Sequence, residues 1–190
     1  MTHPPALDFL LTRRSCPQRM LRAPVPDRDA LMTILTAAAR TPDHGKLEPW
    51  RFVVLEQAAL RRLADLVAPH AAARGLDAEQ TARAQEAYAT GHLAVAVIAS
   101  PRATDKIPQI EQTLSAGAVC LSLLNAALAA GWGANWLTGW PAHDAAFARE
   151  AFGTGEGEFV AGIVHIGTPE RAPTERPRPD VAAITTWIAE

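Results

Sequence analysis

The sequence predicts an α+β fold in a single domain, residues 1–190, with about four strands flanked by helices on both faces of a sheet. An uncharged, mostly apolar run at residues 114–132 has the length of one long helix. Three short β-rich runs, at residues 51–56, 93–99 and 159–166, have the composition of strands. A chain of 190 residues is long enough to bury one sizeable core.

Composition and charge narrow the classes of function. The net charge of −2, from 18 basic and 20 acidic residues, provides no basic field for nucleic acid or anionic membranes. The two cysteines, Cys16 and Cys120, form no CxxC pair or disulfide framework, so we expect a reducing, cytoplasmic compartment. The six histidines show no HExxH or HxH spacing, and we expect no metal site. The first residues show no secretory signal.

Caps, prolines and apolar spacing place the elements along the chain. The expected helices are an amphipathic one begun at Pro4 and Pro5 and ending at residues 13–15, one from the N-cap Asp27 to Arg40, one around residues 60–67, the long one at residues 114–132, and one at residues 141–152 closed by Gly153. A short strand is expected near Asn135, in addition to the three β-rich runs.

Two segments have no clear place in this core. Residues 69–90 contain few large apolar groups, and we expect a mobile helical excursion there that lies outside the core. The tail from Gly167 contains four prolines, so we expect an extended surface segment, with a final helical turn or two at residues 181–189.

The run at residues 114–132 is apolar on all sides, as a buried helix is. A membrane span has a similar length, but the small residues keep the mean hydropathy low and the sequence holds no second span, so we reject that reading. Two alternatives remain: an ordinary core helix, or a helix covered by its own core on one side and by a second copy of the chain on the other. The small residues that would allow close helix approach are Ala116, Gly117, Ala126, Ala127, Ala129 and Ala130.

The end of the first expected helix is a candidate phosphate site. Arg13, Arg14 and Ser15 supply two guanidinium groups and a hydroxyl, and arginine presents forked donors to phosphate oxygens. The alternative is a solvated basic surface.

A stiff loop at residues 41–50 is the second candidate. Arg40 precedes it, and His44 and Gly45 lie between two prolines, where the backbone at glycine can approach a ligand closely. The alternative is a solvent-exposed turn.

Two further segments are candidates. Trp136, Leu137 and Thr138 could border a flat ring with an indole and backbone amides, or could be a short strand with a buried tryptophan. Arg176 and Arg178 could bind phosphate, or could belong to a charged, disordered end. The sequence holds no GxGxxG, GxxxxGK or GxSxG motif, so phosphate-binding arginines without a nucleophile or metal indicate a protein whose cofactor performs the chemistry.

These segments together resemble the nitroreductase family of FMN proteins, in its short single-domain branch. The resemblance runs from about Leu7 to Pro169 and rests on Arg13-Arg14-Ser15, AARTPDHGKLEPWRFVVLE, the Ser-Ala-Gly-rich helix, GANWLTGW, AFG and VHIGTP, with PDHGKLEPW the most specific piece. It implies a central, mainly antiparallel sheet and a homodimer with the long helix at its interface and two FMN molecules shared between the chains.

The resemblance also implies roles for the candidate residues. Arg13, Arg14 and Ser15 would bind the phosphate and ribityl end, and Trp136, Leu137 and Thr138 would line the isoalloxazine ring. Arg40 and His44 would contact the FMN from the partner chain.

Two departures from the family pattern matter. Leu137 stands where related chains often have arginine, and Arg176 or Arg178 could supply the missing charge. Residues 69–90, which often border the substrate opening, match least.

The resulting expectation is an FMN-dependent NAD(P)H oxidoreductase that passes hydride to a small electron-poor acceptor such as a nitroaromatic or quinone. It would act without nucleic acid or a membrane, and no side chain is assigned as a catalytic acid or base. The alternatives are a flavin-dependent dehydrogenase or dehalogenase for one small metabolite, and a non-catalytic flavin-binding dimer module.

Overall fold

The computed structural model describes residues 4–189. The strands are β1 (Leu21–Arg22), β2 (Trp50–Glu56), β3 (Leu93–Ala99), β4 (Gly133–Leu137) and β5 (Phe159–Pro169). The helices are α1 (Pro5–Thr12), α2 (Arg28–Ala38), α3 (Gln57–Ala73), α4 (Ala78–Ala89), α5 (Gln109–Ala129), α6 (Trp140–His143) and α7 (Ala145–Phe152), with short 3-10 turns η1 (Gln18–Met20) and η2 (His44–Lys46).

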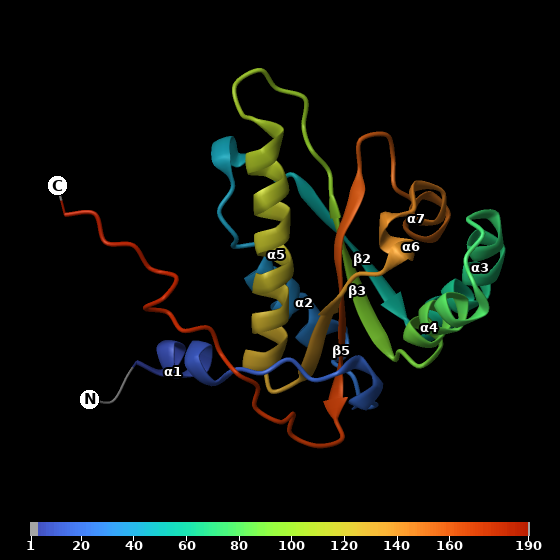
Figure 1. Cartoon of the computed structure of the whole chain (residues 1–190), viewed down its shortest axis with the longest axis horizontal. Helices are drawn as coiled ribbons and strands as arrows, with labels where there is room; N and C mark the ends of the chain where they lie inside the picture. Colours follow the sequence, from blue (N-terminus) through green and yellow to red (C-terminus); the bar gives the residue numbers. More distant parts are fainter. Residues whose placement is uncertain (1–3, 190) are drawn as a thin grey trace.

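The five strands form one antiparallel sheet in which β2, β3 and β5 are neighbours in that order, and β1 pairs with the last two residues of β5. Strand β4 pairs with β5 on the edge opposite β3, since both pair with residues 163–165 of β5. Helices α2 and α5 cover one face, and α3, α4, α6 and α7 cover the other (Figure 1). The predicted α+β class, with helices on both faces of the sheet, is therefore confirmed.

Strand β3 divides the core into two halves. All seven of its residues are buried, as predicted from its lack of polar alternation. Val95 and Val97 point towards α2 and α5, while Ala96 and Ile98 point towards α3 and α7. The two apolar layers are thus built on opposite faces of the same central strand.

Helix α5 is covered on one side only within a single chain. Val119, Cys120 and Leu123 are fully buried against the sheet and α2. On the outer side, Ile110 is 61 % exposed and Leu114 is 65 % exposed. The predicted apolar helix is therefore present, and its outer face carries apolar side chains that are exposed in the single chain.

The prediction that residues 69–90 lie outside the core is wrong. Helix α3 continues through Pro69, and α4 begins at a capping box formed by Asp77 and Gln80. Tyr88 is 4 % exposed and its ring stacks on Phe147, with centroids 5.9 Å apart. One large aromatic side chain among small residues is enough to anchor α4 in the core.

Two helices also differ from the predictions. The first helix ends at Thr12, so residues 13–15 are extended. The helix predicted at residues 141–152 is divided at Asp144, whose carboxylate accepts the backbone N–H of Phe147 (2.6 Å) and thereby starts α7. Gly153 closes α7 in the left-handed conformation, as predicted.

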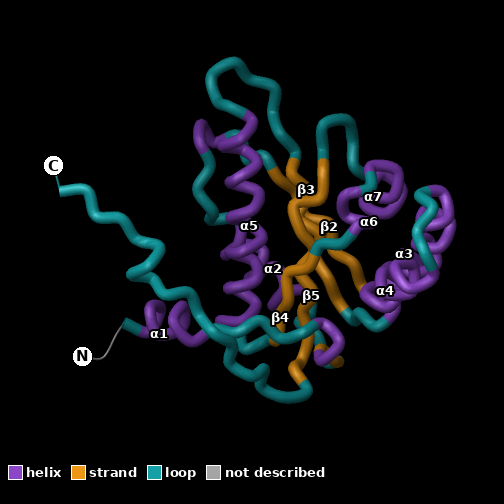
Figure 2. Tube along the Cα trace, in the orientation of Figure 1, coloured by secondary structure: helices purple, strands orange, loops and turns teal. Residues whose placement is uncertain are grey.

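The last strand extends beyond its predicted end. Gly167 pairs with Gly133 of β4, and Pro169 pairs with Leu21 of β1. The two-residue strand β1 was not predicted, because it lies among the prolines of residues 17–26. A proline is tolerated at this position because it ends the strand. Beyond residue 170 the tail is extended and exposed, with one turn at residues 181–184 (Figure 2).

An ion pair between Arg51 and Glu158 holds the loop before β5 against the sheet. The guanidinium of Arg51 donates to both carboxylate oxygens of Glu158 (2.9 and 2.7 Å), and Ser100 and the backbone N–H of Gly155 also donate to that carboxylate. The hydrogen bond from Arg51 is the main cause that lowers the pKa of Glu158 to about 2.

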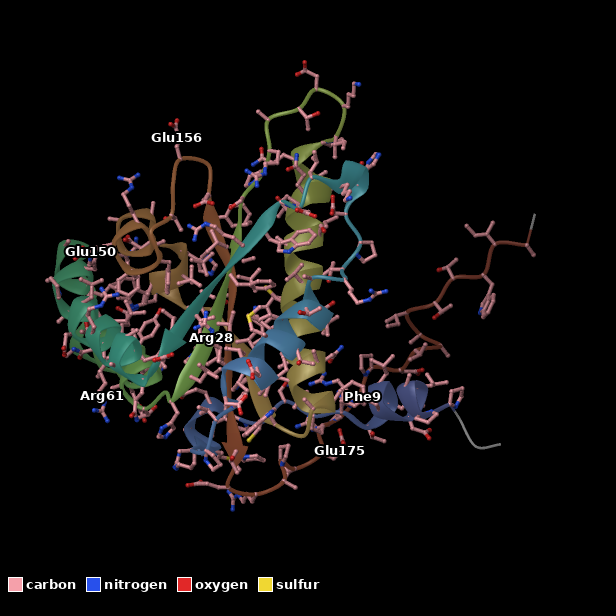
Figure 3. The ribbon with its side chains drawn as sticks, turned by 180° about the vertical axis from the view of Figure 1, so that it is seen from behind. Phe9, Arg28, Arg61, Glu150, Glu156 and Glu175 are labelled. Carbon is pink, nitrogen blue, oxygen red and sulfur yellow. The ribbon has the colours of Figure 1, made fainter. Side chains whose placement is uncertain are left out.

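We predict that Glu158→Gln lowers the free energy of unfolding by about 1.5–3 kcal/mol at pH 7, the usual contribution of hydrogen bonds to a charged group. The pKa of Glu158 is depressed in the folded state, so its stabilisation is present above about pH 4.5 and is lost as the pH falls towards 2. Urea unfolding at pH 7 and at pH 3 should therefore show a smaller difference at pH 3. Glu156→Gln is the matched control, since Glu156 points into solvent at the tip of the same loop (Figure 3); equal losses in both variants would contradict the prediction.

Candidate functional site

The predicted phosphate triplet lies on an extended arm that runs beside β4. The backbone N–H of Cys16 donates to the carbonyl of Ala134 (2.9 Å), on the edge of β4 that β5 leaves free. The Cys16 side chain is 1 % exposed and anchors the arm, and burial raises the pKa of its thiol. This contact places Arg13, Arg14 and Ser15 next to the segment that begins at β4.

Arg13 is positioned as part of a small basic cluster. Its Nη2 donates to Ser15 Oγ (2.8 Å), while its Nε is buried and has no partner among the described residues. Burial is the main cause that lowers the pKa of Arg13, followed by the charges of Arg178 and Arg14. A group of like charges with an unsatisfied donor would be stabilised by an anion.

The C-terminal tail crosses this arm. Arg14 donates from Nε and Nη2 to the carbonyl of Thr174 (3.1 and 2.7 Å). The carboxylate of Glu175 lies 3.7 Å from Arg14 and 3.0 Å from Arg178. Glu175 lies on the tail beside the arm that follows α1 (Figure 3). Arg14 and Arg178 therefore share one carboxylate, and together with Arg13 the cluster keeps a net positive charge.

The two tail arginines differ in their contacts. Arg178 pairs with Glu175 and acts electrostatically on Arg13. The guanidinium of Arg176 makes no ion pair among residues 4–189, and its backbone N–H donates to Glu175. Of the two residues left open by the sequence, Arg178 is the one that the fold brings to the triplet.

The predicted ring-lining segment presents its side chains to two different faces. In the ladder with β5, Trp136 pairs with Val164 on the α5 side, whereas Leu137 pairs with Ile163 on the opposite side. The indole of Trp136 lies over Gly162, where a Cβ would come within 1.9 Å of its Nε1. The shared feature of the segment is therefore its backbone edge, which faces away from β5.

The predicted loop is held on the outer side of α5. Thr41 Oγ1 donates to Ser122 Oγ (2.8 Å), and Ser115 Oγ donates to the carbonyl of Pro42 (2.8 Å). His44 Nδ1 lies 2.6 Å from a carboxylate oxygen of Glu111. Three bonds spread along the helix thus fix the loop that contains His44.

One chain does not bring this loop to the arginine cluster. Glu111 is near the N-terminal end of α5, roughly 27 Å along the helix from Ala129 at the other end. The arm with Arg13 crosses close to that other end (Figure 1). Arg40 is exposed and lies with the loop. The candidate residues therefore form two separate groups in the chain.

The helices α1 and α5, on the side that carries both groups, expose several large apolar side chains. The α1 helix buries none of its residues, so its predicted apolar stripe is exposed. The exposed large apolar side chains on α1 and α5 are Leu7, Leu10, Leu11, Ile110, Leu114 and Leu121. Ala126, in contrast, packs partly against the core of its own chain.

Asn125 is a further candidate residue that was not predicted from the sequence. It is half-buried on α5, and its Oδ1 is buried without a partner among the described residues. A lone amide inside an otherwise apolar helical run was the available signal, because burying a polar group without a partner is costly. No group of three or more potential metal ligands is found among residues 4–189.

Comparison with known proteins assigns the chain to a family. The sequence profile described as "Nitroreductase family" matches residues 10–168. The chain belongs to the nitroreductase family. Two curated members of this family are related along most of their length. "Putative NAD(P)H nitroreductase YdjA" of Escherichia coli K12 is 33 % identical over 184 residues, covering 96 % of this chain and 99 % of that protein. "Putative NAD(P)H nitroreductase" of Haemophilus influenzae is 37 % identical over 164 residues, covering 86 % and 88 %.

Solved structures with the nitroreductase fold superpose on the whole chain. A nitroreductase-like family protein from Bacillus cereus gives a TM-score of 0.81 at 19 % identity, covering 100 % of this chain and 99 % of that one. A Desulfovibrio desulfuricans structure described as a "putative nitroreductase in complex with fmn" gives 0.75 at 21 % identity, with full coverage of both chains. The predicted nitroreductase-like fold is therefore confirmed.

Proposed function

We propose that this nitroreductase-family chain is a single FMN-binding domain, residues 1–190, and an oxidoreductase that uses NAD(P)H to reduce a small electron-poor acceptor. The observation that carries the proposal is the cluster of Arg13, Arg14 and Arg178, in which one buried guanidinium nitrogen has no partner among residues 4–189. Two related chains are called NAD(P)H nitroreductases, and a structure with the same fold holds FMN. FMN, when bound, accepts hydride from NAD(P)H and delivers it to the acceptor.

The residues of the site fit FMN. The arginine cluster with Ser15 matches one terminal phosphate, which binds to forked donors and to a hydroxyl. The free backbone edge at residues 136–138 lies next to the cluster and offers hydrogen-bonding groups to a flat heterocycle. Trp136, fixed over Gly162, supports that edge from the α5 side.

The division of the candidate residues supports a shared site. His44 lies near the end of α5 remote from Arg13, and Arg40 precedes Thr41, which bonds to Ser122 on the outer side of the same helix. A two-fold partner that packs on this side would bring its own loop to the cluster. The exposed apolar side chains of α1 and α5 provide the surface for that contact. We propose a homodimer in which each FMN is bound by both chains.

We further propose that the protein works in the cytoplasm. Its two cysteines are free and buried. By length and composition, α5 is the one described helix that could cross a membrane, and 44 % of its most apolar window is buried in this fold. An inner face that packs on the sheet is typical of a core helix.

The direct test is the spectrum and turnover of the purified protein. We expect a yellow protein that releases FMN on denaturation, oxidises NADH or NADPH, and accelerates when a nitroaromatic or quinone is added. A flavin-bound protein without NAD(P)H oxidation would support the non-catalytic alternative, and a colourless protein that does not bind added FMN would overturn the proposal.

We predict that Arg13→Ala weakens FMN binding by about 1.5–3 kcal/mol, the range for hydrogen bonds to charged groups. The fold should survive, because residue 13 lies on an arm at the surface. Fluorescence titration of the flavin-free protein measures the affinity. Arg19→Ala is the control, since Arg19 is exposed in a neighbouring turn; unchanged affinity in folded Arg13→Ala would place the phosphate elsewhere.

We predict a difference between the two tail arginines. Arg178→Ala should weaken FMN binding by about three- to tenfold, because Arg178 acts on Arg13 and adds positive charge to the cluster. Arg176→Ala should leave the affinity within twofold of the original. The loss of affinity caused by Arg178→Ala should be smaller at 0.3 M salt than at low salt, since salt screens exposed charges. The reverse order of the two variants would contradict this assignment.

We predict complementation between two inactive variants. Arg13→Ala and His44→Ala chains, each deficient in FMN binding, are mixed and allowed to exchange subunits. A mixed dimer then has one site with both lesions and one with neither, so random exchange restores about one quarter of the sites. Activity after mixing, compared with the sum of the separate samples, measures the recovery. A monomer that binds FMN and turns over would exclude the shared site.

A further inference from the structure

A pocket lined by arginines, here called the arginine pocket, lies where the start of α3 meets the end of α4. Its volume is about 440 Å³, and no residue of the proposed FMN site lines it. The cationic side chains in its wall are Arg19 from η1, Arg22 from β1 and Arg61 from α3. Arg61 lies on the opposite side of the molecule from Phe9 and Glu175, which mark the arm and the tail of the FMN site (Figure 3). The arginine pocket is therefore a separate feature.

Side-chain hydrogen bonds hold the walls of this pocket together. Gln18, in the turn that carries Arg19, donates from Nε2 to Thr90 Oγ1 (3.0 Å), directly after α4. The side-chain nitrogen of Gln57, the first residue of α3, lies 3.1 Å from Nδ1 of His92, which precedes β3. Four segments that are far apart in the sequence are thus fixed around one space.

Arg22 forms a fixed side of the pocket. Its Nη1 donates to the carbonyls of Arg19 (2.8 Å) and Leu21 (3.0 Å). Its Nη2 lies 2.7 Å from a carboxylate oxygen of Glu170, so its charge is offset by an acidic partner. Arg22 therefore shapes the wall and adds little free charge.

Arg19 and Arg61 have no such partner. Neither guanidinium makes an ion pair or a hydrogen bond with another group among residues 4–189, although the carboxylate of Glu86 also lines the pocket. Three guanidinium groups and one carboxylate face the same space. Cations that face one another repel, and an anion between them removes this repulsion. The excess of positive charge favours an anionic ligand.

A phosphate group suits the donors of the pocket. Guanidinium groups present forked N–H donors that match phosphate oxygens. The neutral polar side chains of Gln57, Thr90 and His92 complete the wall around the two arginines without a charged partner. A pocket of this volume lies within the range for small molecules, which leaves room for the compound that carries the phosphate.

We propose that the arginine pocket binds a phosphate monoester, with Arg19 and Arg61 as its charged contacts. The phosphate belongs to a free organic phosphate or is the 2′-phosphate of NADPH, and the two sources share the same chemistry. A bound phosphate would join η1 to α3 through one charged group. The site is built from residues outside the proposed FMN site, so it does not depend on flavin binding.

The test is a titration of the FMN-loaded protein with inorganic phosphate at constant ionic strength, with chloride as the other anion. The side-chain Nε–H resonances of Arg19 and Arg61 in a ¹⁵N-labelled sample, each assigned by its loss in the alanine variant, report binding. We expect both resonances to shift with one dissociation constant. These resonances are distinct from that of Arg13, so the result stands whether or not FMN binds. No shift, or shifts that do not saturate, would overturn the proposal.

Variants of opposite charge separate a built site from a basic surface. Read from the Arg19 resonance, Arg61→Ala should weaken phosphate binding by about five- to twentyfold, because a charge-assisted hydrogen bond is lost. Arg62→Ala, exposed on the same helix outside the pocket, is the matched control and should stay within twofold. Glu86→Gln should tighten binding by about two- to fivefold, since it removes the carboxylate from the wall. Equal losses in Arg61→Ala and Arg62→Ala, or no gain in Glu86→Gln, would contradict the proposal.

Two nucleotides distinguish the sources of the phosphate, because NADP⁺ carries the 2′-phosphate and NAD⁺ lacks it. Displacement of inorganic phosphate by NADP⁺ alone would identify the ligand as the 2′-phosphate of the nucleotide. Displacement by neither would assign the arginine pocket to a free organic phosphate. Equal displacement by both would mean that the pocket recognises another part of the dinucleotide, and would overturn the assignment to a phosphate monoester.

Discussion

The register of β5 governs the position of the ring-lining segment and of the arm that carries the arginine triplet. This strand is hydrogen-bonded to β1, β3 and β4, and a one-residue slip would exchange the faces of all their side chains. In the observed register, Trp136 faces α5 and Leu137 faces α6. The same ladder fixes the free edge of β4, where the arm after α1 attaches through Cys16.

The two faces of the sheet therefore differ in what they contain. The α5 side carries the apolar stripe, the tethered loop with His44 and the arginine arm, which together suit assembly and anion binding. The α4 side is closed within the chain and contains the arginine pocket at the start of α3. Because the central strand β3 is buried on both faces, the two regions are built on one packed layer.

Much of this arrangement could be predicted from the sequence, where the signal was local. The continuous apolar run of β3, the long helix α5 and the glycine cap after α7 all follow from composition and spacing. The failures needed long-range information. Strand β1 exists because Leu21 meets Pro169, and α4 enters the core mainly through Tyr88. In the site, Arg178 was distinguishable from Arg176 only once the tail was seen crossing the arm through Thr174, and the arginine pocket combines separate segments that form no sequence motif.

The single backbone bond between Cys16 and Ala134 has a consequence for handling the protein. It covers only the first part of the outer edge of β4, so the backbone groups at residues 136–138 form a short template to which another strand can add. A ligand or partner chain bound along that edge would also protect it from edge-to-edge aggregation. Loss of the covering group, through dilution or dialysis, would therefore reduce solubility before it reduced the content of secondary structure.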